Sequence, residues 1–197
     1  MQPLFAQHLL FRTVVLVAYG LWAVMEVILV VRQLLLLHTG IQLRDKGSRV
    51  VVTVTIGLGI VLCWGLPSAV PAATIPSVFV FWLGLVLVYA GLAFRLWAVV
   101  VLGRYFTPSV AVAAAQHVVE RGPYKLIRHP GYTGLLLMFL GFGLCSTNWL
   151  SLLALMGCIL TGLGYRIFVE ERVLQEHMGQ RYKEYMHRTK RLIPFIF

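Results

Sequence analysis

The stretch "RGPYKLIRHPGYTG" at residues 121–134 places cationic side chains and turn-forming residues directly before the apolar run "LLLMFLGFGL" at 135–144. A polar segment followed at once by such a run is typical of the point where a chain enters a membrane. A simple surface anchor needs the cations, but it needs neither two prolines and three glycines nor two tyrosines. The stretch therefore predicts a shaped loop in front of a membrane helix.

The composition of the whole chain agrees with a membrane location. Of 197 residues, 59% are hydrophobic and 12% are charged, and a soluble fold of this size has no interior large enough to bury so much apolar surface. The net charge of +10 lies beside apolar segments, which predicts contacts with membrane lipids and no nucleic acid partner. Three cysteines in or beside apolar runs and six scattered histidines predict neither a disulfide nor a metal site.

Apolar runs separated by charged or proline-containing links predict an all-α, polytopic integral membrane protein with about five transmembrane helices. The first run contains Glu26 and lacks a basic n-region and a small-residue cleavage site, so we expect a retained span rather than a signal peptide. The predicted spans are residues 11–31, 50–66, 77–102, 132–146 and 149–167.

The lysines and arginines predict the orientation. Four lie between spans one and two, four between spans three and four, and seven from Arg166 onward, whereas the other two links have none. With five spans, all three basic segments fall on one side, which the positive-inside rule makes cytoplasmic. We therefore expect the N-terminus outside and the C-terminus in the cytoplasm.

Glycines in spans four and five predict a closely packed helical hairpin; they are Gly134, Gly141, Gly143, Gly157, Gly162 and Gly164. No GxGxxG follows a predicted strand, which excludes a Rossmann-type nucleotide-binding domain. Two charges, Glu26 and Arg95, lie well inside predicted spans. Because an unpaired charge at membrane depth is costly, we expect the two to approach each other or to line a cavity, unless either one reaches an interface.

Three polar segments fall on the predicted cytoplasmic side: residues 115–132, 165–177 and 179–197. On a helix, Arg166 and Glu170 share a face, although such a pair is usually a surface ion pair of little weight. Together the segments offer guanidinium groups, carboxylates and aromatic faces, which suit an amphipathic zwitterion. The residues alone predict a polar pocket at the cytoplasmic face and leave the reaction open.

Two blocks within residues 103–197 resemble the isoprenylcysteine carboxyl methyltransferase and phospholipid methyltransferase families. The first block consists of Val118, Val119, Gly122, Pro123, Tyr124, Arg128, His129, Pro130, Tyr132 and Gly134. The second consists of Arg166, Glu170, Glu171, Leu174, Gly179, Tyr182, Tyr185, Pro194 and Phe195. The resemblance implies an all-helical, S-adenosylmethionine-dependent membrane methyltransferase. It would be a single domain, 1–197, with three spans in 1–102 and the cofactor pocket in 103–197.

The resemblance also implies roles for individual residues. Arg166 would face the methyl acceptor, and Glu171 or Glu170 would act as the base if the acceptor were an amine. The cofactor contacts would be Gln116, His117, Val118, Val119, Tyr124, His129, Pro130, Gly131, Tyr132 and Glu170. Without the family, His129 reads as a helix cap, Tyr132 and Tyr182 as interfacial aromatics, and Arg128 as a headgroup contact or a support for the carboxylates.

The expected acceptor is the carboxylate of a prenylated cysteine or a related lipophilic molecule, and amines and thiols remain open as alternatives. A carboxylate is already a nucleophile at neutral pH, so that reaction needs alignment and dehydration more than acid–base help. Two other functions stay open. One is a sterol-reductase-like enzyme that uses reduced nicotinamide, and the other is a non-catalytic membrane subunit that binds lipid headgroups.

Overall fold

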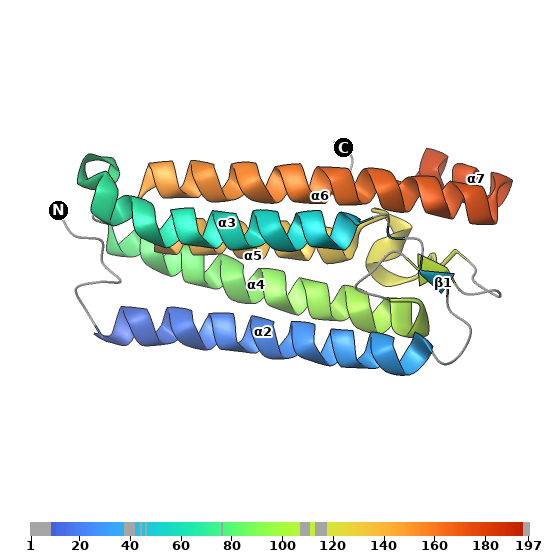
Figure 1. Cartoon of the computed structure of the whole chain (residues 1–197), viewed down its shortest axis with the longest axis horizontal. Coiled ribbons are helices and arrows are strands. Elements are labelled where there is room, and N and C mark those ends of the chain that lie inside the picture. Colours follow the sequence, from blue (N-terminus) through green and yellow to red (C-terminus); the bar gives the residue numbers. More distant parts are fainter. Residues whose placement is uncertain are drawn as a thin grey trace.

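The structure, a computed structural model, describes residues 9–37, 42–43, 45, 47–75, 77–106, 111–112 and 118–194. Five long helices lie side by side at the positions of the five predicted spans, and the short helix α7 follows them (Figure 1). The all-helical fold class is therefore confirmed. The helices are α2 (Leu9–Leu37), α3 (Ser48–Ala69), α4 (Val78–Leu102), α5 (Pro130–Cys145), α6 (Trp149–Met178) and α7 (Gln180–Arg188).

Short elements occupy the links between the long helices. The two strands in the described residues, β1 (Gln42–Leu43) and β2 (Ala111–Val112), pair antiparallel. Three single-turn helices complete the set: η1 (Pro71–Ala73), η2 (Gly103–Tyr105) and η3 (Gly122–Lys125).

Four of the long helices, α2, α3, α4 and α6, are long and apolar enough to cross a membrane. The fifth, α5, has 16 residues and a length of about 24 Å, less than the ~30 Å of a bilayer core. Most of its side chains are buried among the other helices. The fifth crossing therefore stays a prediction.

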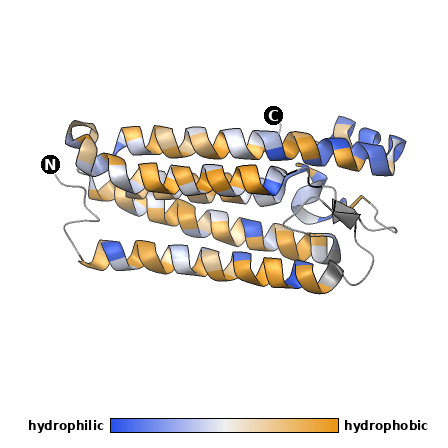
Figure 2. Ribbon diagram, in the orientation of Figure 1, coloured by the Kyte–Doolittle hydropathy of each residue, from blue (hydrophilic) through white to orange (hydrophobic). Residues whose placement is uncertain are grey.

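The links between helices alternate between the two ends of the bundle. At one end, β1 from the α2–α3 link pairs with β2 from the α4–α5 link. At the other end, Thr74 of the α3–α4 link forms a bridge with Asn148 of the α5–α6 link. Five antiparallel helices require this arrangement. Hydrophilic residues gather at the first end, on α7 and the end of α6 (Figure 2).

Gly134 and Gly141 of α5 pack against α4, and Gly162 of α6 packs against Thr55 of α3, which corrects the predicted partner. A Cβ at Gly141 would lie 2.5 Å from the Gly84 carbonyl oxygen, and one at Gly91 would lie 2.5 Å from the Met138 nitrogen. Only Gly143 of α5 meets α6, at Leu152, whereas Gly157 of α6 has nothing within 4 Å. The α5 glycines therefore hold this helix against α4, so that its first turn lies beside Arg95.

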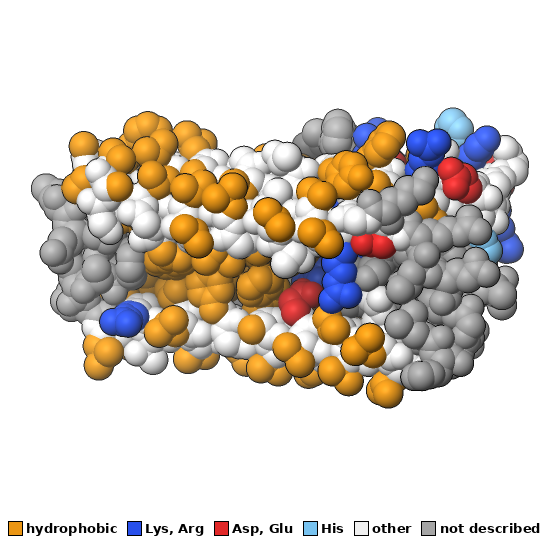
Figure 3. Space-filling view, in the orientation of Figure 1, with side chains coloured by type: hydrophobic (Ala, Val, Ile, Leu, Met, Phe, Trp, Pro, Cys, Tyr) orange, Lys and Arg blue, Asp and Glu red, His pale blue; other side chains and the backbone are white. Residues whose placement is uncertain are grey.

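The aromatic core lies toward the end of the bundle that is remote from α7. Phe81, Phe139 and Phe142 are fully buried, and Tyr19 of α2 stacks on Phe142 with 3.8 Å between ring centroids. Between α2 and the upper helices lies a hollow with an apolar floor, and charged side chains of both signs lie at the end of it that is nearer to α7 (Figure 3). The hollow marks the candidate site.

Candidate active site

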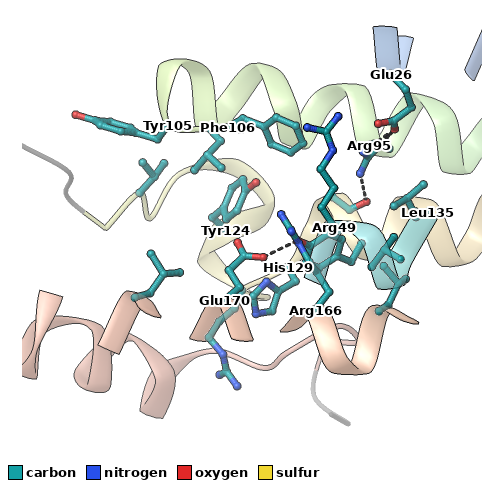
Figure 4. Close-up of a pocket in the computed structure, with 18 of the residues that line it drawn as sticks. Glu26, Arg49, Arg95, Tyr105, Phe106, Tyr124, His129, Leu135, Arg166 and Glu170 are labelled. Carbon is teal, nitrogen blue, oxygen red and sulfur yellow. Dashed lines mark hydrogen bonds and ion pairs between the residues drawn. The ribbon is translucent and has the colours of Figure 1, made fainter. Parts of the chain in front are cut away.

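A cavity of about 470 Å³ opens between the helices near the hydrophilic end of the bundle. Charged, aromatic and aliphatic side chains line it, and all five long helices and α7 contribute (Figure 4). The prediction confined the pocket to 103–197, but α2 and α3 supply much of the wall. From these two helices come Trp22, Ala23, Glu26, Val30, Arg49, Val52, Thr53 and Ile56.

The loop before α5 forms a wall of the cavity because turn residues fold it back. Gly122 begins η3 with φ +54°, a conformation that other residues rarely adopt. Pro130 occupies the first turn of α5, where a missing N–H costs nothing. Between them, the backbone N–H groups of Arg128 and His129 donate to the carbonyl oxygens of Lys190 and Arg191 at 2.7 and 3.0 Å. The C-terminal segment therefore holds the loop in place.

Tyr132 connects Arg166 and Glu170, the two charged residues that were predicted to share a face of α6. Arg166 Nε donates to the Tyr132 hydroxyl at 3.0 Å, and this hydroxyl donates to Glu170 Oε2 at 2.5 Å. The ring of His129 stacks near Tyr132, with 5.5 Å between centroids. All four residues line the cavity. The predicted association of the loop with α6 is present, and a tyrosine hydroxyl mediates it.

Asp45, before α3, and Ser48, its first residue, hold Arg166 in place. Asp45 pairs with Arg166 Nη1, and Ser48 Oγ accepts from the same nitrogen at 2.9 Å. The Ser48 hydroxyl donates to Asp45 Oδ1 at 2.8 Å, and the backbone N–H of Arg49 donates to Asp45 Oδ2 at 2.9 Å. The Asp45 carboxylate thus accepts from the first turn of α3 and pairs with Arg166 at the same time. Only 4% of the Arg166 side chain is exposed, so its direction is fixed.

Glu171, the other predicted catalytic carboxylate, lies behind the cavity and is absent from its lining. Arg128 Nε, His129 Nε2 and Arg191 contact it at 2.9, 3.3 and 3.2 Å. Arg128 also donates to the carbonyl oxygens of Met186 and Thr189. The cluster ties α6, the loop and the C-terminal segment together, which gives Arg128 the supporting role that the sequence left as one alternative.

The charges expected at membrane depth form a pair. Arg95 Nη2 lies 2.7 Å from Glu26 Oε1, and Arg95 Nη1 donates to the Gly131 carbonyl oxygen at 3.1 Å. The Arg95 guanidinium also lies over the ring of Phe106, 5.7 Å from its centroid. The prediction that Glu26 and Arg95 approach each other is confirmed, and both also line the cavity.

Three tyrosines close the cavity at its α7 end: Tyr124, Tyr182 and Tyr185. The Tyr185 hydroxyl donates to the Tyr124 carbonyl oxygen at 2.7 Å. Burial raises the pKa of all three phenols above the ordinary value, because a desolvated phenolate is unfavourable. These side chains therefore stay protonated at neutral pH and present uncharged rings and O–H donors.

Most predicted cofactor contacts converge on this cavity. Gln116 and His117 lie outside the described residues, and Pro130 is buried behind the lining. Sequence reasoning missed Arg49, Asp45 and Ser48, because no pattern marks them. The predicted residues that line the cavity are Val118, Val119, Tyr124, His129, Gly131, Tyr132, Arg166 and Glu170.

The family assignment follows from a match that contains Tyr132, Arg166 and Glu170. The profile of the phospholipid methyltransferase family matches residues 79–181, from the start of α4 into α7. The chain belongs to this family. Four apolar helices of sufficient length accompany the match, so the chain is a polytopic integral membrane protein. Asp45, Ser48 and Glu26 precede the matched segment.

Individual relatives point in the same direction. A probable protein-S-isoprenylcysteine O-methyltransferase of Oryza sativa subsp. indica is 37% identical over 120 residues, which cover 60% of this chain and 63% of the rice protein. Protein-S-isoprenylcysteine O-methyltransferase B of Arabidopsis thaliana is 30% identical over 115 residues, 57% of this chain and 58% of that protein. The chain thus spans less than two thirds of the length of these relatives.

A solved structure is also similar. It is that of the eukaryotic intramembrane Ras methyltransferase ICMT, isoprenylcysteine carboxyl methyltransferase, with 26% sequence identity and a TM-score of 0.56. The similarity covers 73% of this chain and 52% of the ICMT chain. The helical arrangement is therefore shared over most of the present chain.

Proposed function

We propose that this protein transfers a methyl group from S-adenosylmethionine to the carboxylate of a prenylated cysteine or a closely related lipophilic acceptor. The observation that carries the proposal is the single cavity in which the 118–132 loop and the Arg166–Tyr132–Glu170 chain meet apolar side chains of α2 and α3. Such a cavity suits one polar and one lipophilic ligand. The names of the rice and Arabidopsis relatives support the choice of acceptor.

The donor set of the polar part fits S-adenosylmethionine. Glu170 offers a carboxylate for an ammonium group, and Tyr124 and Tyr132 offer aromatic faces for a flat ring or a sulfonium. Val118 and Val119 border the same space, and their backbone groups would serve the adenosine. When bound, the cofactor supplies an electrophilic methyl group on sulfur.

The chain's own residues would then align and dehydrate the reactants. Arg166 is held by Asp45, Ser48 and Tyr132, so it would orient the acceptor carboxylate without reorganising. A carboxylate needs no base to react, which agrees with the position of Glu171 behind the lining. Buried tyrosines and the docked C-terminal segment would keep water out.

The orientation in the membrane remains part of the proposal. The hydrophilic end of the bundle, with the cavity and α7, would face the cytoplasm, and the N-terminus would lie outside. The water-soluble cofactor would then enter from the cytoplasm, whereas a lipophilic acceptor would arrive from the membrane.

The first test is ligand binding and turnover with purified protein in lipid nanodiscs. We expect calorimetric titration to detect S-adenosylmethionine and S-adenosylhomocysteine, and labelled methyl to appear on an S-farnesyl cysteine acceptor as a base-labile ester. Binding of NADPH alone would contradict the methyltransferase. Transfer to phospholipid amines without ester formation would contradict the proposed acceptor.

The second test separates the roles of two residues on α6. Glu170→Ala should weaken S-adenosylhomocysteine binding about tenfold or more, the size of one hydrogen bond to a charged group. Arg166→Ala should leave this affinity nearly unchanged and reduce turnover. Arg172→Ala, an exposed position on the same helix, is the matched control. The assignment is wrong if the effects of the Glu170 and Arg166 variants are exchanged.

A further inference from the structure

Arg49 faces the cavity from the start of α3. It belongs to the first turn of this helix and lines the cavity, and Figure 4 shows its side chain extending from α3 into the cavity toward Phe106 and Arg95. The partial positive charge at a helix N-terminus disfavours a cation in the first turn. Helix electrostatics therefore do not account for Arg49, and a cation that faces the interior of a membrane protein points to a function.

The backbone of Arg49 is fixed beside Arg166 by a shared carboxylate. Asp45 Oδ2 accepts from the backbone N–H of Arg49 at 2.9 Å, and Asp45 Oδ1 pairs with Arg166 Nη1. Ser48, the residue before Arg49, accepts from the same Arg166 nitrogen at 2.9 Å. Arg49 and Arg166 are therefore neighbours on the cavity wall, one from α3 and one from α6, and one ligand group can meet both.

The carboxylates near Arg49 form ion pairs with other arginines. Toward α4 and α2, Arg95 Nε and Nη2 donate to Glu26 Oε1 at 3.0 and 2.7 Å. Before α3, Asp45 pairs with Arg166. Neither pair carries a net charge, so the Arg49 guanidinium favours an anionic ligand group in this part of the cavity.

One face of α3 has a charged end and an apolar remainder. Residues 49, 52, 53 and 56 line the cavity, and their spacing places them on one side of the helix. Arg49 lies at the end next to Arg166, and Val52 and Ile56 follow in the direction of the aromatic core. The Thr53 hydroxyl donates to the Arg49 carbonyl oxygen at 2.9 Å, so its proton is used within the helix. The face fits an amphipathic ligand whose anionic end meets Arg49.

From these contacts we infer that Arg49 selects the acceptor by its charge. Together with Arg166 it binds the carboxylate of the substrate, and it holds the methyl ester product less tightly. The inference rests on the proposed function. In that transfer a methyl–sulfur bond breaks, a bond between the methyl group and a carboxylate oxygen forms, and the electron pair stays on sulfur. No proton moves and the negative charge of the acceptor disappears, so Arg49 loses its partner on the ligand and the product is exchanged for a new acceptor.

The test compares binding of two ligands that differ in this charge: N-acetyl-S-farnesyl-cysteine and its methyl ester. Calorimetry in nanodiscs with S-adenosylhomocysteine present measures both affinities without turnover. The wild-type protein should prefer the acid by about tenfold or more, as expected for a hydrogen bond between charged groups. Arg49→Gln should weaken binding of the acid about tenfold and leave that of the ester within about threefold. Arg49→Lys keeps the charge without the planar fork and should retain part of the preference.

Arg172→Gln is the matched control, because it removes an exposed arginine at the same end of the bundle; it should keep the preference. The affinity of Arg49→Gln for S-adenosylhomocysteine should stay within about threefold of wild type. A larger loss in a folded variant would assign Arg49 to the cofactor carboxylate and overturn the inference. Tryptophan fluorescence on heating reports folding, and Arg49→Met, with the same expected loss, takes the place of a Gln variant that does not fold.

Three further results would overturn the inference. They are equal wild-type affinities for the acid and the ester, no wild-type affinity for the acid, and an Arg49→Gln variant that binds the acid within threefold of wild type. Failure of the proposed function gives a different result: the preference for the acid depends on Arg49, but no ester forms.

Discussion

At the scale of single residues, the Tyr132 hydroxyl is the contact on which the site depends most. It accepts from Arg166 and donates to Glu170, so one O–H group fixes both charged side chains. Tyr132→Phe should lower kcat/KM about tenfold to a hundredfold, as expected for lost hydrogen bonds to charged groups. Tyr165→Phe, at an exposed position of α6, is the control. Equal rates for the two variants would show that the bridge is dispensable.

Asp45 offers a second test at this scale, because it pairs with Arg166 but does not line the cavity. Asp45→Ala should reduce kcat about tenfold, because Arg166 loses the carboxylate that it pairs with. The affinity for S-adenosylhomocysteine should stay within about threefold of wild type. Asp45→Asn keeps the acceptor oxygen and should recover part of the rate. Ser77→Ala removes the cap of α4 far from the site and controls for a lost cap. Weaker cofactor binding with normal kcat would refute the positioning role.

At the scale of elements, α5 matters because its position against α4 sets the place of the loop. Gly141→Ala should cost about 1–3 kcal/mol of stability, because the new Cβ would lie 2.5 Å from the Gly84 oxygen. Gly157→Ala is a matched control: nothing lies within 4 Å of that site, and alanine favours helix. Thermal unfolding in detergent with tryptophan fluorescence measures both. A Gly141 variant as stable as the Gly157 variant would contradict the packing.

The same scale shows what sequence could predict. Long apolar runs predicted the five helix positions, and the cost of a charge at membrane depth predicted the Glu26–Arg95 pair. The register of a helix placed Arg166 and Glu170 on one face. Asp45 could not be predicted: it lies in a loop and meets Arg166 across 121 residues of sequence. The helix that packs on the α5 glycines could not be predicted either. Glycine spacing indicates a surface that allows close approach, but it does not indicate which helix approaches.

At the scale of the whole molecule, one cavity is lined both by the segment that the family profile matches and by the segment before it. The family match begins at residue 79, and within it lie the loop, Tyr132, Arg166 and Glu170. Glu26, Asp45, Ser48 and Arg49 come from the part before it, and they hold or face the same space. Under the proposed function, the side chains of α2 and α3 that line the cavity would contact the acceptor.

The orientation of the whole molecule gives the last prediction. Basic residues at the α7 end predict that this end is cytoplasmic, whereas the α3–α4 link, which has no lysine or arginine, would face outward. A cysteine at Lys183 and another at Ala72, both exposed positions, report the two ends. In intact cells a membrane-impermeant maleimide should label Ala72→Cys and spare Lys183→Cys until the membrane is opened. The native Cys63 and Cys145 are buried, and the unmutated chain measures background labelling from Cys158. Labelling of Lys183→Cys in intact cells would show the opposite topology, with the cavity on the side of the membrane away from the cytoplasm.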